Sequence, residues 1–165
     1  MNNEDLEILI KKTKDRATEI FAKTENCAYS PFIALMEAIN VPLNDEINAI
    51  PIGFAGGISG SGHICGALWA SIATISIYQK KIVDKNNENK NEPFTLHYIS
   101  VHNKSSETYK NFVNTFGSPN CKDLNPKFDL ISEEQRKKCT YIVRKSVEIT
   151  LRELFEKESD KNGKQ

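Results

Sequence analysis

The sequence predicts an all-α protein, a single-domain bundle of about five or six helices with a glycine-rich loop before a central buried helix. Apolar residues recur at intervals of three and four through the long segments, which is the spacing of one helix face. Residues that commonly cap helices, among them Asn26, Asn44 and Ser132, stand before these segments. A chain of 165 residues is long enough to bury the core of one such domain. We expect the domain to span residues 1–158.

The first half of the chain contains four expected helices. Residues 4–24 form an amphipathic helix, and Asn26 caps a second helix over residues 27–40. A short third helix follows Asn44. Residues 64–82 carry small and apolar side chains on nearly every side, which is typical of a helix surrounded by other helices. This segment is therefore the expected central element.

The second half is less regular. Residues 84–93 are polar and of low complexity, which predicts an exposed loop. Residues 94–101 are compatible with a short strand or with the approach to a helix, and we expect a helix over 105–116. A long helix from Ser132 to about residue 157 has an apolar stripe that includes Cys139. Residues 159–165 are expected to be a disordered tail.

The charge balance and the hydropathy pattern exclude several classes of protein. Lys plus Arg and Asp plus Glu number 22 each, so the clustered positive charge that nucleic acid binding needs is not expected. Residues 47–79 are uncharged, but Pro51 and the glycines interrupt them, so we interpret them as buried core instead of a membrane span. Residues 1–12 do not resemble an export signal. We therefore expect a cytoplasmic protein without nucleic acid or membrane partners.

The four cysteines are the candidate functional residues. In a reducing compartment they are not expected to form structural disulfides, so metal ligation, a catalytic dithiol or packing remains. No CxxC pair occurs, and the usual zinc-ribbon, rubredoxin, ferredoxin and thioredoxin signatures are absent. The candidates are Cys27, Cys65, Cys121 and Cys139.

The loop before the central helix has an unusual density of glycine. Glycine has no Cβ, so such a loop can bring main-chain N–H groups close to a ligand. The candidates for these contacts to a cofactor are Gly56, Gly57, Gly60, Gly62 and Gly66. Cys65 stands in the first turn of the helix that follows, where the helix dipole favours a thiolate. The loop lacks the Lys-Ser/Thr pair of a P-loop, and a tight turn between packed helices is the structural alternative.

Four segments together resemble a known family. Their order is Asn26-Cys27, then Cys65-Gly66-Ala67 after the glycine loop, then Phe116-Gly117-Ser118-Pro119-Asn120-Cys121, then Cys139. This arrangement resembles the redox-active family named for its C-GCAxxG-C-C pattern, and it is similar to the cysteine-rich region of split-Soret cytochromes. The resemblance covers residues 15–155. It departs from the family name at Ile64 and Gly66, which flank Cys65 in place of Gly and Ala, and at Ala70 in place of a glycine.

The resemblance implies a helical protein with a redox-active site of four cysteines. The similarity to split-Soret cytochromes adds an iron–sulfur cluster of unknown type and a homodimer. No Cys-x-x-Cys-His is present, so covalent haem attachment of the c type is not expected. The few polar positions on the central helix also favour a homodimer.

Several functions remain open from the sequence. The first is an iron–sulfur protein for electron transfer or redox sensing, whose four cysteines are the ligands and whose redox partner protein is unidentified. The second is a thiol–disulfide redox protein with Cys65 as the reactive thiolate, and the third is a structural zinc site of four cysteines. The fourth is a helical interaction module in which the cysteines are packing residues of the core. His63 is a weak additional ligand candidate, and His97 and His102 are expected to face solvent.

Overall fold

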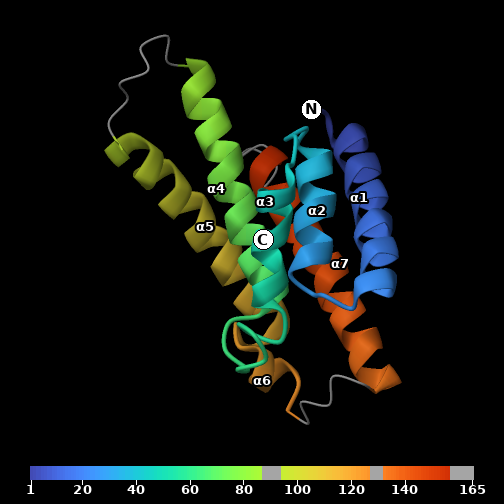
Figure 1. Ribbon diagram of the computed structural model, residues 1–165. Helices are drawn as coiled ribbons and strands as arrows, with labels where there is room; N and C mark the ends of the chain where they lie inside the picture. Colours follow the sequence, from blue (N-terminus) through green and yellow to red (C-terminus); the bar gives the residue numbers. More distant parts are fainter. Residues whose placement is uncertain (87–93, 127–131, 157–165) are drawn as a thin grey trace.

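The computed structural model describes residues 1–86, 94–126 and 132–156, and within these ranges every regular element is a helix and there is no strand. Figure 1 shows the long helices lying side by side as a bundle. The elements are α1 (Asn3–Thr24), α2 (Tyr29–Ala38), α3 (Asp45–Ala49), the 3-10 helix η1 (Ile50–Phe54), α4 (Gly66–Asn86), α5 (Phe94–Phe116), α6 (Cys121–Leu124) and α7 (Glu133–Phe155). The predicted all-α class is therefore confirmed. None of the described helices is long and apolar enough to cross a membrane.

Helix α4 is the centre of the bundle. It packs against α2, α5, α7 and η1, and Figure 1 shows it between α5 and α2. Leu68 and Ile75 are fully buried by these neighbours. Trp69 stacks on Phe54 of η1 with ring centroids 4.1 Å apart, so it is a core contact. The chain thus covers its own central helix, and the expected homodimer stays a prediction.

The predicted caps Asn44 and Ser132 are present, whereas α2 has Ala28 as its N-cap and the predicted cap Asn26 lies two residues before it. The side-chain oxygen of Asn26 accepts hydrogen bonds from the N–H groups of Ala28 and Tyr29, at 3.1 and 2.8 Å. Asn44 Oδ1 accepts from the third residue of α3, and Ser132 Oγ accepts from the third residue of α7. Each cap satisfies an N–H group that has no partner inside its own helix.

Two sequence predictions are corrected. The strand suggested for residues 94–101 is wrong, because α5 begins at Phe94. This half of α5 packs along α4, where Ser100 Oγ donates to Gln79 Oε1 at 2.6 Å and a ring nitrogen of His97 lies 3.4 Å from the carbonyl oxygen of Ser76. Such tertiary contacts override a weak local preference.

The other correction concerns the polar loop expected at residues 84–93. Helix α4 continues to Asn86, and residues 87–93 lie outside the described ranges. The short helix α6 was also not predicted within the irregular segment around Cys121. The tail at 159–165 lies outside the described residues.

Ion pairs join α1 to α7. Glu148 on α7 accepts from Lys14 of α1 at 2.9 Å and from Lys145 at 2.9 Å, and its side chain is only 16% exposed. Burial alone would raise the pKa of Glu148, but the hydrogen bonds from Lys145 and Lys14 outweigh it and lower the pKa to about 2. The carboxylate form is therefore the one that the folded state favours.

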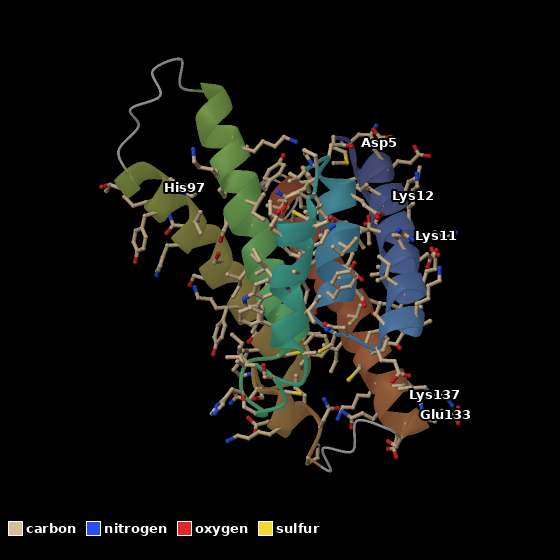
Figure 2. The ribbon with its side chains drawn as sticks, in the orientation of Figure 1. Asp5, Lys11, Lys12, His97, Glu133 and Lys137 are labelled. Carbon is tan, nitrogen blue, oxygen red and sulfur yellow. The ribbon has the colours of Figure 1, made fainter. Side chains whose placement is uncertain are left out.

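We expect Glu148→Gln to lower the free energy of unfolding at pH 7 by about 2 kcal/mol. A lowered pKa contributes stability that is present above the ordinary value of 4.5 and is lost as pH falls toward 2. The loss of stability between pH 5 and 3 should therefore be smaller in the variant, as urea titrations at several pH values would measure. Glu133→Gln is the matched control, because the partner of Glu133 among the described residues is the exposed Lys137 one turn away, as Figure 2 shows at the start of α7. Equal effects of the two variants at pH 7 would contradict this account of the α1–α7 contact.

Candidate cysteine site

Five segments meet at one end of the bundle. Figure 1 shows there the end of α1, the beginnings of α2 and α7, the glycine loop and α6. Cys27 lies two residues before the start of α2, and Cys65 immediately precedes α4. Cys121 is the first residue of α6, and Cys139 lies in the second turn of α7. The structure therefore brings all four predicted cysteines to the same end.

The glycine loop folds with a run of positive φ angles. They are 66° at Gly56, 74° at Gly57, 78° at Gly60 and 79° at Gly62. The absence of a side chain matters most at Gly57, where an added Cβ would lie 2.6 Å from the carbonyl oxygen of His63 and 2.8 Å from the Cβ of Cys121. The loop is thus in direct contact with the segment that contains Cys121.

Main-chain hydrogen bonds tie two of the cysteine segments together. Cys65 N–H donates to the carbonyl of Pro119 at 2.7 Å, and Cys121 N–H donates to the carbonyl of His63 at 2.6 Å. Between them, Ile64 and Asn120 form an isolated antiparallel bridge. This pairing holds Cys65 beside Cys121 even though 56 positions separate them in the chain.

Main-chain N–H groups point at two of the sulfur atoms. The donors are Gly56 and Gly66 for the Cys27 sulfur, and Ala67 and Leu68 for the Cys65 sulfur. Gly66 also packs closely against the Cys27 sulfur, because an added Cβ at Gly66 would lie 2.9 Å from Cys27 Sγ. Of the five candidate glycines, Gly56 and Gly66 therefore contact a cysteine sulfur through their N–H groups.

Side-chain amides lie within hydrogen-bond distance of the other two sulfur atoms. Asn125 Nδ2 lies 3.8 Å from Cys121 Sγ and 3.9 Å from Cys139 Sγ, and Gln135 Nε2 lies 3.8 Å from Cys139 Sγ. Sequence reasoning missed both amides. The available signal was their spacing, since Asn125 follows Cys121 by four residues and Gln135 precedes Cys139 by four, one helical turn in each case.

Burial dominates the acidity of the four thiols. It raises the pKa of each one, to about 11 for Cys139. Repulsion from Cys27 and Cys121 raises the pKa of Cys65 and of Cys139 further. The predicted effect of the helix start on Cys65 is present, because the N–H groups of Ala67 and Leu68 lower its pKa, but burial is the larger effect.

A pocket of about 200 Å³ opens onto the site. Cys27, Cys121 and Cys139 line it, together with residues of the glycine loop and the start of α7, whereas Cys65 is not among the lining residues. The lining residues are Phe21, Glu25, Cys27, Ala55, Gly56, Gly60, Cys121, Gln135, Arg136 and Cys139. The pocket is therefore bordered by three of the four cysteines, of which Cys121 is as deeply buried as Cys65, at 4% exposed.

The remaining candidates lie around this centre. Gly62 lies against Lys122, with an added Cβ 3.0 Å from its side chain, and not against a cysteine. The side chain of His63 is exposed, which does not favour a role as a ligand, and the residue joins the site through its main chain. His97 lies on α5, far from the cysteine end and partly buried against α4, in contrast to the solvent-facing position expected (Figure 2). His102 is exposed as expected.

Comparison with known proteins supports the importance of these four positions. Residues 25–153, which include all four cysteines, match the family model described as "Putative redox-active protein (C_GCAxxG_C_C)". The chain belongs to this family. It is also 51% identical over 144 residues to an "Uncharacterized protein" of Archaeoglobus fulgidus, a match that covers 87% of this chain and 94% of that one. No solved structure matches.

Family membership supports a redox role for this chain. The departure at Gly66 has a structural reason in this chain, because any larger residue would collide with Cys27 Sγ, with the Phe54 carbonyl and with Ala28. Counted from Cys65, the last glycine of the family pattern falls at Trp69, whose ring stacks on Phe54, and not at Ala70, which is fully buried.

Proposed function

We propose that the four cysteines of this family member hold an iron–sulfur cluster, and that the protein transfers electrons or senses redox state through it. The observation that carries the proposal is that the four cysteines lie at one end of the bundle with N–H groups around them: side-chain amides within 3.9 Å of the Cys121 and Cys139 sulfur atoms, and main-chain N–H groups that lower the pKa of Cys27 and Cys65 against the effect of burial. Cluster ligands are thiolates, and N–H donors stabilise the negative charge of cluster and ligands. The set of donors thus fits this group.

A structural zinc site fits less well. Zinc holds four thiolates at about 2.3 Å from a single point, which requires a tight group of sulfur atoms. Among residues 1–86, 94–126 and 132–156, no group of three or more His, Cys, Asp or Glu side chains is arranged to hold one metal ion. In an iron–sulfur cluster the thiolate ligands bind to several iron atoms, so the cysteine sulfur atoms can lie farther apart.

A thiol–disulfide function with Cys65 as the nucleophile also fits less well. An attacking thiol needs access and a substantial thiolate fraction at neutral pH. Cys65 is almost fully buried, and burial raises its pKa. The three thiols of the pocket have raised pKa values as well, so the site lacks the acidic cysteine that such enzymes use.

In the proposed function the protein holds and shields the cofactor. A bound cluster supplies one-electron redox chemistry. The cysteines would hold it, and the glycine loop and the start of α4 would shield it from water on the side of Cys65. The pocket beside Cys27, Cys121 and Cys139 would be the side from which a redox partner protein approaches. A reducing, cytoplasmic location and a homodimer complete the proposal.

The proposal is tested by anaerobic reconstitution with iron and sulfide, followed by titration with a reductant. We expect a visible absorbance band that bleaches on reduction and returns on reoxidation, because one-electron cycling of a cluster is reversible. Zinc loading without any visible chromophore would favour the structural site. A protein that consumes two oxidising equivalents per chain without iron would favour a disulfide.

A further inference from the structure

Asn125 is placed differently from the other polar residues of the site. It follows the last residue of α6, and it is 96% buried, with 4% of its surface exposed. Its single amide nitrogen lies within 3.9 Å of two sulfur atoms, those of Cys121 and Cys139, which belong to different helices. One side chain therefore links two of the four cysteine segments.

The oxygen of the same side-chain amide differs from the nitrogen in its surroundings. Asn125 Oδ1 is buried and has no hydrogen-bond partner among the described residues. Burial of a polar atom without a partner is unfavourable, so an apolar residue of the same shape would serve better if packing alone mattered. The nitrogen compensates for this only if the sulfur atoms it faces are strong acceptors, and a thiolate is a far stronger acceptor than a thiol.

We propose that Asn125 is a positioning residue of the cysteine site, whose amide N–H groups donate to Cys121 and Cys139 together and stabilise both sulfur atoms in the negatively charged form that ligates iron. This inference rests on the proposed function for the identity of the cofactor. The hydrogen bonds themselves hold for the thiols with or without iron. Donation to ligand sulfur stabilises the more negative, reduced state of a cluster, so Asn125 also raises its reduction potential.

The test compares Asn125→Leu, which keeps the shape, and Asn125→Asp, which keeps the oxygen but removes the donor. In protein without iron, alkylation of each cysteine is followed at one pH by mass spectrometry. We expect Cys121 and Cys139 to react about threefold to tenfold more slowly in both variants, with Cys27 of the same molecule as the internal reference. In iron-loaded protein, the midpoint potential should fall in both.

The control is Asn48→Leu. Asn48 also has a buried Oδ1 without a partner among the described residues, but it lies on α3. Its replacement should change neither alkylation nor potential. A purely structural role for Asn125 would change the melting temperature alone, and unchanged alkylation ratios in Asn125→Leu would overturn the inference. Unchanged alkylation of Cys121 and Cys139 in Asn125→Asp, together with slower alkylation in Asn125→Leu, would also overturn it, because the oxygen of Asn125 would then be the atom that matters. Absence of iron from the wild-type protein would refute the proposed function, whereas the alkylation ratios would still decide the role of Asn125.

Discussion

Replacing Cys65 by Ser should abolish or strongly reduce the visible absorbance of the iron-loaded protein. Cys65 is buried beside Cys27 and Cys121, and two main-chain N–H groups at the start of α4 donate to its sulfur. A serine hydroxyl is a poor substitute because iron in clusters is held by soft thiolates. Iron and sulfide content, measured after anaerobic reconstitution, reports the loss directly.

The other three cysteines provide the comparison. Cys27→Ser, Cys121→Ser and Cys139→Ser should each lower the iron content, since all four sulfur atoms are expected to be ligands. If the cysteines only pack, each change costs roughly 1–3 kcal/mol of stability and has no other effect. Iron at the wild-type level in all four single mutants would contradict the cluster proposal. Loss in only two or three would mean that a residue other than cysteine completes the site.

The largest expected loss of stability follows Gly57→Ala. Gly57 has φ of +74°, and a Cβ there would lie 2.6 and 2.7 Å from main-chain atoms of His63 and 2.8 Å from the Cβ of Cys121. Main-chain atoms on a hydrogen-bonded segment cannot move aside cheaply, so we expect a loss of about 3 kcal/mol or more, measured by urea denaturation. Reconstituted iron should fall as well, because the loop carries a donor to Cys27.

Gly60→Ala is the matched control for that change. Gly60 has nearly the same φ, +78°, but an added Cβ would have nothing within 4 Å. This variant therefore isolates the cost of the left-handed conformation, about 1 kcal/mol. If Gly57→Ala and Gly60→Ala had equal effects, the close contact between the loop and the Cys121 segment would not be important for stability.

Much of the fold was predictable because its signals are local. Helix α1 follows from the spacing of its apolar residues, and the caps Asn44 and Ser132 mark helix starts that the structure contains. The first half of α5 was not predictable with the same certainty, because its aromatic and β-branched residues are compatible with a strand. Its helical state depends on contacts with α4, such as the hydrogen bond between Ser100 and Gln79.

The candidate site was predictable in its cysteines but not in its donors. The family resemblance singled out all four cysteine positions, and the glycine density indicated that main-chain N–H groups approach a ligand. The position of Cys65 at a helix start was also predictable, but its burial is a tertiary property, and burial determines the direction of its pKa shift. Asn125 and Gln135 are single polar residues whose partners are defined only after α6 and α7 pack together.

The central claim is that four cysteines hold one iron–sulfur cluster, and its most direct test is the iron and acid-labile sulfide content of anaerobically purified protein, measured with its absorption spectrum. We predict iron and sulfide in comparable amounts and a visible band that disappears in Cys65→Ser. Protein that contains neither element after both purification and reconstitution under anaerobic conditions would contradict the claim.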